Sequence, residues 1–468
     1  MDVLSIEVLD RIGLTLELII AKSSPTNHHC RHTDFTFMEK NQVIKRRFLF
    51  VSRWGDILDI ANAVKEEGND VKMYIEYKPC QEIGSGFIPK ARDWKKHIDW
   101  ADIIVFDYTG YGKIATELKA SGKPVIGGTE YTDNLELDRS FGQNELKRHK
   151  INILKYKEFQ TYQDAITYVE SHPNSYVLKP SGEAQDYKQL LFVGKEEDGS
   201  DIVRMLKAYE KTWGDSLGAF QLQRRVKGVE VSVAAFFNGK EFIKPVNITF
   251  EHKKLFPKEL GVSTGEMGTS MFWTKDNPIF DATLGRMEKT LRSENFTGHI
   301  DINCIVNGKG IYPLEFTSRF GFPQIYLQRA GIKEPFGEML FKVATGQNFT
   351  LRTRVGFQVG AYMVVPPFPY TDPETFNLFS KDAVVVFKDK KKKGIHPLHL
   401  KQVSDEWLIT GDSGMPLFVA GTGTTMKEAQ RMLYNRISNV LINNVYYRTD
   451  IGDRWTEDSD KLWAWGLL

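Results

Sequence analysis

The sequence has few cysteines and no excess of charge of either sign. Only three of its 468 residues are cysteines, too few and too scattered for a disulfide framework, which favours a reducing, cytoplasmic setting. Its 62 basic residues nearly balance its 60 acidic ones, so the composition does not favour nucleic acid or a membrane as a partner. We therefore predict a cytoplasmic monomer or weak oligomer whose partners are small molecules.

Long apolar runs are missing as well. No run reaches the roughly 18 residues that span a bilayer. The longest early run, Leu14–Ile20, lacks the basic flank of a secretory signal. The hydrophobic content of 41% is typical of a globular protein. A globular chain of this length should divide into about three domains, because a single hydrophobic core does not grow to this size.

The most informative stretch runs from Gly298 to Gln324. Two segments in which apolar and polar residues alternate, His299–Val306 and Ile311–Phe316, flank the turn sequence Asn-Gly-Lys-Gly. Alternation is typical of a half-buried strand, and Asn-Gly between two such segments is the strongest short-range signal for a β-hairpin. The sequence therefore predicts an antiparallel hairpin here.

Polar side chains of this hairpin gather on one face. Because neighbouring residues of a strand point to opposite faces, Asp301 and Asn303 share one face of the first strand. By the same rule Glu315, Thr317 and Arg319 share one face of the second. Oxygen ligands suit Mg2+ or Mn2+, and an adjacent guanidinium can hold a phosphoryl group. Taken alone, an ordinary amphipathic hairpin with a solvated polar face explains the pattern better than a metal site does.

A resemblance to a known family favours the metal site over the solvated hairpin face. The order of Gly298, Asn303 and the sequence Glu-Phe-Thr-Ser-Arg-Phe-Gly-Phe-Pro from Glu315 resembles the metal-binding end of the ATP-grasp ligases. Among these ligases, it is most similar to the phosphoribosylamine–glycine ligase family of purine biosynthesis.

Two further regions resemble the same family, in the same order. Glu251–Lys254 and Ser263–Gly268 are similar to its Asp-His-Lys-Arg and Asn-Thr-Gly-Gly-Met-Gly motifs. Tyr446–Gly452 is similar to its closing Phe-Tyr-Arg-Arg-Asp-Ile-Gly motif. The resemblance extends from about Lys45 to Trp455, and three ordered motifs are far more specific than one.

The resemblance implies a multidomain α/β and α+β protein with the ATP-grasp fold. The domains that it implies are an N-terminal parallel α/β domain at 38–137, an ATP-grasp domain at 138–350 and a small β-rich C-terminal domain at 351–468. Residues 1–37 lie outside the resemblance, and we expect them to be a disordered, dispensable extension. The strand–helix–strand pattern at Phe48–Ser52, Asp56–Glu67 and Asp70–Tyr77 independently predicts a parallel sheet.

Two later segments also carry local signals. The run Lys388–Lys393 predicts a solvated hairpin tip, because it is strongly basic and follows the apolar stretch Val384–Phe387. A helix is predicted from Met426 to about Asn443. Earlier in the chain, Asp138 is a plausible N-cap for a helix that reaches about His149.

The resemblance implies that the chain binds ATP. Lys179 ends an apolar strand and matches the position whose charge neutralises the α- and β-phosphates. Arg139 matches a lysine that reaches the phosphates, and Glu230 matches a carboxylate that accepts the ribose hydroxyls. Backbone groups near Gln221 and Gln223 would read adenine. The implied ATP-binding set is Arg139, Lys179, Lys188, Gln221, Gln223 and Glu230.

The resemblance also implies residues for the metal, the second substrates and catalysis. Mg2+ or Mn2+ would be held by Asn303, Glu315 and Thr317. Lys179 and Arg319 would stabilise the charge of the reacting phosphoryl group. A basic pocket rim, made flexible by glycines, would bind the other substrates. Its residues would be His252, Lys253, Lys254, Thr264, Gly265 and Gly268.

The implied reaction joins glycine to 5-phosphoribosylamine through an acyl phosphate, at the expense of ATP. The sequence departs from the family pattern in three places. Thr317 replaces a metal-ligating Asn, Phe322 and Gln324 replace acidic residues, and the phosphate-binding turn has one glycine, Gly55. Two alternatives therefore stay open: an ATP-grasp ligase for another amino acid and amine, and a nucleotide-binding homologue without full turnover.

Overall fold

The computed structural model describes residues 44–181, 190–214 and 218–468. The predicted extension at 1–37 lies outside the described residues, as do residues 182–189, which include Lys188. Across the described ranges, no helix is long and apolar enough to cross a membrane.

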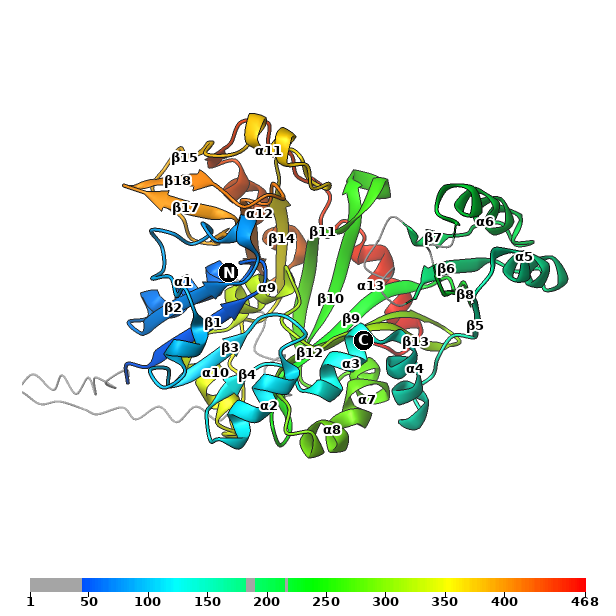
Figure 1. Cartoon of the computed structure of the whole chain (residues 1–468), viewed down its shortest axis with the longest axis horizontal. Helices are drawn as coiled ribbons and strands as arrows, with labels where there is room; N and C mark the ends of the chain where they lie inside the picture. Colours follow the sequence, from blue (N-terminus) through cyan, green and yellow to red (C-terminus); the bar gives the residue numbers. More distant parts are fainter. Residues whose placement is uncertain (1–43, 182–189, 215–217) are drawn as a thin grey trace, which may run out of the picture. The chain divides into compact units, whose positions relative to one another are not determined.

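The N-terminal region forms a parallel sheet in the order β2-β1-β3-β4 (Figure 1). The central strand β1 is apolar and buried along almost its whole length, as expected for a parallel strand covered on both faces. The strands of this sheet are β1 (Arg47–Ser52), β2 (Asp70–Ile75), β3 (Ile103–Phe106) and β4 (Val125–Ile126). The helices of this region are α1 (Leu58–Glu66), α2 (Gly112–Ala120), α3 (Glu130–Leu137) and α4 (Arg139–Arg148).

A second, small sheet follows in the order β5-β8-β6-β7, and its strands are antiparallel. Two helices pack on it around a hydrophobic core of their own, so we call this part the small lobe. Its elements are β5 (Tyr156–Phe159), α5 (Tyr162–Ser171), β6 (Tyr176–Pro180), β7 (Phe192–Val193), α6 (Ser200–Thr212) and β8 (Phe220–Arg224).

Within the described residues, the largest sheet has eight antiparallel strands in the order β13-β12-β9-β10-β11-β14-β19-β16 (Figure 1). Long hairpins build its first half: β9 (Val229–Asn238), β10 (Phe242–Phe256), β11 (Leu260–Thr274), β12 (Thr297–Asn307) and β13 (Gly310–Thr317). Its second half comes from the C-terminal region: β14 (Phe357–Met363), β16 (Ile395–Pro397) and β19 (Leu417–Gly423). The sheet therefore continues across the predicted boundary at 350/351.

Helices flank this sheet, and a last small sheet lies in the C-terminal region in the order β17-β18-β15-β20. The helices are α7 (Pro278–Ala282), α8 (Leu284–Ser293), α9 (Gln324–Gly331), α10 (Phe336–Ala344), α11 (Pro373–Phe379), α12 (Met426–Ile437) and α13 (Trp455–Ala464). The strands of the last sheet are β15 (Val384–Phe387), β17 (Leu400–Val403), β18 (Glu406–Ile409) and β20 (Val440–Leu441).

Buried polar contacts join the N-terminal sheet to the helices that follow β13. The Arg329 guanidinium of α9 donates to both carboxylate oxygens of Asp59 on α1, at 2.7 and 2.8 Å. Although burial opposes the shift, Arg329 and His396 lower the pKa of Asp59 to about 2. Glu67 accepts the first two amides of α10, at 2.6 and 2.8 Å. These bonds satisfy helix-terminal donors that have no partner within the helix.

The predicted fold class and most predicted elements are confirmed, including the parallel sheet, the hairpin at 299–316 and the Asp138 cap of α4. Two local predictions were wrong. Lys388–Lys393 is not a hairpin tip, because β15 before it and β16 after it pair in different sheets. The helix predicted to reach about Asn443 ends at Ile437, before the short strand β20.

Candidate active site

The β12–β13 hairpin brings the predicted metal-binding residues together. In its register Asn303 stands directly opposite Glu315, and Asp301 stands opposite Thr317. Residues in directly opposite positions of a ladder point to the same face. Arg319 lies beyond the end of β13, yet it lines the same cavity of about 200 Å3 as Glu315 and Thr317. The predicted clustering of these side chains is therefore present in the structure.

The neighbouring strands β9 and β10 extend this face. The Lys253 ammonium lies 2.6 Å from a Glu230 carboxylate oxygen and 3.1 Å from a Glu251 oxygen. The Asn303 amide nitrogen donates to the same two carboxylates, at 3.0 and 3.3 Å. Burial opposes a charged Lys253, but Glu251, Glu230 and Glu315 hold its pKa well above the usual range. A charged lysine thus sits among three carboxylates.

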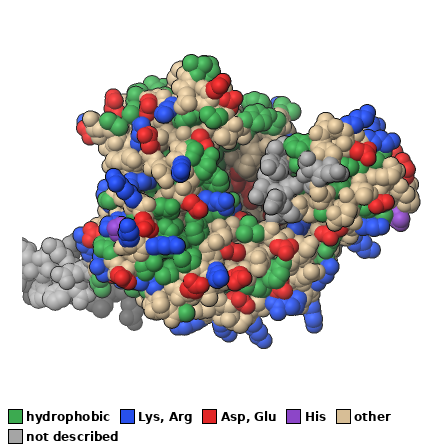
Figure 2. Space-filling view, in the orientation of Figure 1, with side chains coloured by type: hydrophobic (Ala, Val, Ile, Leu, Met, Phe, Trp, Pro, Cys, Tyr) green, Lys and Arg blue, Asp and Glu red, His purple; other side chains and the backbone are tan. Residues whose placement is uncertain are grey.

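Two further cations approach from other elements. Lys179 is the next-to-last residue of β6 and is only 7% exposed. Burial and the nearby Arg139 guanidinium lower the pKa of Lys179 to about 8, while Glu315 opposes the shift. Arg139 begins α4, directly after its N-cap Asp138, and it also lies near Glu315. Figure 2 shows a hollow in the molecular surface with acidic side chains in its depth. Cations gathered around one exposed carboxylate suit a polyphosphate with a bridging metal.

One atom of the site, the amide oxygen of Asn303, is chemically suited to bind a metal ion. Asn303 is 4% exposed, and its amide oxygen is buried without a hydrogen-bond partner in the described part of the chain. Its amide nitrogen faces two carboxylates, which fixes the orientation of the amide. The oxygen and the opposite Glu315 are hard donors of the kind that Mg2+ takes in small number beside phosphates. These two residues fit a magnesium ion.

Thr317 is a weaker member of this donor set. Its side chain hydrogen-bonds to Asp301, a carboxyl group whose pKa burial and the nearby Glu251 raise well above its usual range. A hydroxyl group in such a bond keeps a lone pair for a metal. Among the described residues, no three His, Cys, Asp or Glu side chains converge as a metal site. Any divalent ion here therefore depends on the amide and on phosphate oxygens as well as on Glu315.

Arg319 is held by residues far from it in the sequence. Its guanidinium lies 3.1 Å from Glu136 at the end of α3 and stacks on the Tyr108 ring, 4.8 Å from the ring centroid. Burial opposes its charge, but Glu136, Tyr108 and Asp301 raise the pKa of Arg319. A guanidinium fixed in this way is oriented before any ligand binds.

The predicted substrate-binding rim is not a single surface. Glu251–Lys254 lies in β10, so alternate side chains point to opposite faces, and His252 points away from Lys253. His252 is 1% exposed, and burial with the nearby Arg454 lowers its pKa to about 3. It is therefore a neutral, buried residue, because an imidazole with this pKa does not take up a second proton near neutral pH.

The glycine-rich stretch of that rim is a strand with a bulge instead of a loop. Ladder pairing runs from His252 opposite Gly268 to Lys254 opposite Ser263, so residues 264–267 of β11 stand opposite Lys253 alone. Gly268 is paired with β10 and also with β14. Its amide is therefore no free anion donor, contrary to the prediction.

The remaining rim residues, Thr264, Gly265 and Lys254, differ in how far they are exposed. Thr264 is buried, and its hydroxyl donates to the Lys253 carbonyl at 2.9 Å. Gly265 is exposed, and a methyl group at its Cα would meet no atom within 4 Å. The Lys254 carbonyl accepts a bond from Arg448, whereas its own side chain is partly exposed. Gly265 and parts of the Lys253 and Lys254 side chains are thus accessible.

The strand of the predicted adenine-reading segment is paired on both of its edges. β8 is paired on both sides, with β5 and with β6, so the backbone at Gln221 and Gln223 has no free edge. The buried Gln221 side chain donates to Glu158 at 2.8 Å and also bonds Gln143. The segment that follows, 225–227, lies outside any strand. Even there, the Arg225 amide donates to the Ser175 carbonyl at 2.9 Å, and the Lys227 carbonyl accepts from the Asn307 side-chain amide at 2.8 Å.

In the predicted phosphate turn of the N-terminal sheet, two backbone amides donate to nearby side chains of the same region. The Arg53 amide donates to Asp107 at 3.3 Å, and the Gly55 amide donates to the Ser52 hydroxyl at 2.8 Å. Burial raises the pKa of Asp107 to about 7. Trp54 packs edge-on against Tyr77, as expected for a packing residue. This turn therefore differs in chemistry from a glycine-rich phosphate cradle.

Several site residues escaped sequence reasoning. Glu136 and Tyr108 come from the N-terminal region, and nothing local relates them to the hairpin. Asp301 carries a signal, since it shares a strand face with Asn303. Glu251 and Glu266 belong to the resembling motifs; Glu266 interacts with Glu251 and Asp301, and burial and these charges raise its pKa well above its usual range.

Comparisons with known proteins agree with this geometry. Residues 137–325 match the family model of the phosphoribosylglycinamide synthetase ATP-grasp (A) domain. A phosphoribosylamine–glycine ligase of Streptococcus pneumoniae is 24% identical over 412 residues, which cover 85% of this chain and 94% of that protein.

Solved structures share the fold. The crystal structure of a phosphoribosylamine–glycine ligase from Thermotoga maritima has a TM-score of 0.66 at 18% identity, covering 87% of this chain and 100% of that one. The biotin carboxylase domain of a Hydrogenobacter thermophilus 2-oxoglutarate carboxylase, crystallised with MgADP, has a TM-score of 0.59 at 10% identity, covering 86% and 91%.

Fold and site together define an ATP-grasp protein. Within that class, residues 137–325 match the ATP-grasp (A) domain of the phosphoribosylglycinamide synthetases, and the predicted resemblance to phosphoribosylamine–glycine ligases is confirmed over most of the chain.

Proposed function

We propose that the protein is an ATP-dependent ligase that joins glycine to 5-phosphoribosylamine. The observation that carries this proposal is the gathering of Lys179, Arg139 and Lys253 around the Glu315–Asn303 pair. The naming of its relatives as phosphoribosylamine–glycine ligases supports the choice of substrates. ATP and Mg2+ are the cofactors that this site chemistry calls for.

The reaction needs two displacements and no side-chain nucleophile. A glycine carboxylate oxygen attacks the γ-phosphorus of ATP, which releases ADP and forms an acyl phosphate. The amine nitrogen then attacks the acyl carbon and loses a proton, and inorganic phosphate leaves. Both steps concentrate negative charge on phosphoryl oxygens, so preorganised cations lower the barrier.

The side chains of this chain supply that preorganisation. Lys179 and Arg139 would neutralise the phosphates, and Arg319, held by Glu136, would face the transferring phosphoryl group or acyl phosphate. Asn303 and Glu315 would hold Mg2+, which supplies charge neutralisation between phosphate oxygens when bound. Lys253 would keep Glu230 and Glu251 apart from the anionic substrate by pairing with both.

Release of ADP tests this function directly. We expect ADP release that requires Mg2+, glycine and 5-phosphoribosylamine together, measured in a coupled assay with each component omitted in turn. If the protein binds ATP but releases no ADP with any carboxylate and amine, the result would instead favour a nucleotide-binding protein without turnover.

A ligase for another carboxylate and amine is the second candidate, and two observations favour it. Two amides of the phosphate turn, those of Arg53 and Gly55, are already bonded, and acidic Asp107 accepts the first of these bonds. Gln324, where relatives are expected to be acidic, is buried and bonds the Thr249 hydroxyl at 2.6 Å. ADP release with a different amine and none with 5-phosphoribosylamine would establish this candidate.

Substitution of Thr317 by Asn should tighten the metal site. An amide can donate to Asp301, as the hydroxyl does now, and still present its carbonyl oxygen, a better donor for a hard cation. We expect Thr317→Asn to lower, several-fold, the Mg2+ concentration that gives half-maximal ADP release. Thr167→Asn, on the exposed side of α5, is the matched control. An unchanged Mg2+ requirement would show that Thr317 does not face the ion.

A further inference from the structure

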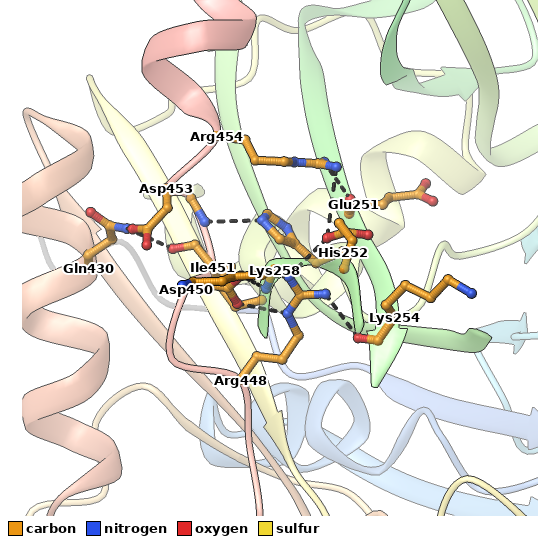
Figure 3. Close-up of polar contacts among 12 residues, drawn as sticks. Glu251, His252, Lys254, Lys258, Gln430, Arg448, Asp450, Ile451, Asp453 and Arg454 are labelled. Atoms are coloured by element: carbon orange, nitrogen blue, oxygen red, sulfur yellow. Dashed lines mark hydrogen bonds and ion pairs between the residues drawn. The ribbon is translucent and has the colours of Figure 1, made fainter. Parts of the chain in front are cut away.

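The segment Arg448–Arg454 contacts β10 next to the site (Figure 3). The Arg454 guanidinium donates to the Glu251 carbonyl at 2.8 Å, and the Arg448 guanidinium donates to the Lys254 carbonyl at 2.9 Å. Between them, the Gly452 amide donates to the His252 ring at 3.4 Å. Three consecutive points of contact therefore tie this segment to the stretch of β10 that carries Glu251 and Lys253.

Along this stretch, β10 is not regularly paired with its neighbouring strands. The ladder with β11 is irregular at Lys253, because residues 264–267 bulge out opposite it. On its other edge, the pairing of β10 with β9 ends at Thr249. The carbonyls of Glu251, Lys253 and Lys254 all accept bonds from side chains instead. Side-chain donors thus stabilise the backbone where the sheet does not.

One of these donors, Arg448, is itself held by several partners. Arg448 has a side chain that is 1% exposed, and it donates twice to Asp450 at 2.8 Å and once to Glu259 at 2.9 Å. Asp450 also accepts the Lys258 amide at 2.9 Å, close to the β10–β11 turn. A guanidinium with all these partners keeps one position, so it acts as a fixed anchor for the backbone.

The backbone direction of β10 decides where its side chains point. Lys253 must reach Glu230, and Glu251 must reach both Lys253 and Asn303, to form the charged group described above. Figure 3 shows the Glu251 carboxylate extending away from the carbonyl that Arg454 holds. A small rotation of this strand would move both side chains, and sites of this kind tolerate misplacement of only about 0.5 Å.

We propose that Arg448 and Arg454 are positioning residues for the reaction, which act by holding β10 so that Lys253 and Glu251 meet Glu230 and Asn303. The proposal rests on the proposed function for its effect on turnover. It extends the working site beyond residues 137–325, the part that matches the ATP-grasp domain model. The closing motif of the chain is then part of the catalytic apparatus through β10.

Arg454 offers the cleaner test, because its side chain is 36% exposed and can be truncated without burying a cavity. We expect Arg454→Ala to lower kcat for ADP release by about 10- to 100-fold, the order of loss that a displaced catalytic geometry causes. Arg454→Lys, which keeps one donor for the Glu251 carbonyl, should recover most of the rate. Arg354→Ala is the matched control, since Arg354 also donates to a main-chain carbonyl, that of Ala330.

Binding of β,γ-imido ATP in the presence of Mg2+, measured by calorimetry, separates this proposal from the proposed function. If the parent protein releases no ADP, the proposed function fails, and Arg454→Ala should still weaken this binding relative to Arg354→Ala. Arg448→Lys should behave like Arg454→Ala in both assays while it remains folded by circular dichroism. Unchanged kcat and unchanged binding in Arg454→Ala, or failure of Arg454→Lys to recover either loss, would overturn the positioning role.

Discussion

Glu315→Gln is expected to remove Mg2+-dependent ADP release, with a loss of at least ~10²–10³-fold in kcat. Glu315 is the carboxylate around which Lys179, Arg139 and Lys253 gather, and it stands opposite Asn303 in the hairpin. Gln is nearly isosteric, but it lacks the negative charge that offsets a divalent ion between phosphates. The measurement is the Mg2+ dependence of ADP release in the variant and in the parent protein.

The fold should survive this change, because the Glu315 side chain is exposed. Glu117→Gln, at an exposed position of α2, is the matched control and should leave the Mg2+ dependence unchanged. Full activity in Glu315→Gln would show that the metal lies elsewhere, and the hairpin would then keep only a structural role.

Lys179→Ala is expected to weaken ATP binding by about 10- to 150-fold, which corresponds to roughly 1.5–3 kcal/mol for a charge-assisted contact. Lys179 is 7% exposed and lies beside Arg139, so the two cations repel one another until an anion binds between them. Adenosine, which has no phosphates, should bind the variant and the parent protein equally. Calorimetric titration with ATP and with adenosine measures both affinities.

Two further variants separate charge from packing at this position. Lys179→Met retains most of the buried stem and should lose as much ATP affinity as Lys179→Ala. Lys207→Ala, on the exposed face of α6, should lose none. Equal losses for ATP and adenosine would identify Lys179 as a residue that supports the small lobe instead of the phosphates.

Much of the fold follows from short-range patterns in the sequence. The apolar run of β1 and the helical segment after it predict a parallel sheet, and the alternation on either side of Asn307-Gly308 predicts the β12–β13 hairpin. Asp138 caps α4 as its position before the helix predicts. These features depend on residues a few positions apart, whose periodicity and hydrogen bonds are local. They were therefore predictable without tertiary structure.

Part of the candidate site was also accessible from the sequence, which placed Asn303 and Glu315 each on the polar face of its own strand. A bulge next to Asn303 then decides that the two stand opposite each other, because the register set by the turn alone would pair Asn303 with Leu314. Lys179 and Arg139 were found through resemblance to a family, since neither position has a local signal of its own. The resemblance also placed His252, Lys254 and Gly268 in the predicted pocket; in the structure His252 is buried and bonded by Gly452, and Gly268 pairs with both neighbouring strands.

Only the tertiary structure decided which distant segments complete the site. Glu136 and Tyr108 reach Arg319, and Arg448 and Arg454 reach the backbone of β10 from almost 200 residues away. Each contact joins elements whose pairing depends on the packing of whole sheets, and periodicity along one strand contains no information about it. The sequence by itself determined the hairpin, the charges and the class of chemistry. The tertiary structure decided how a bulged strand is anchored and which side chains share the site.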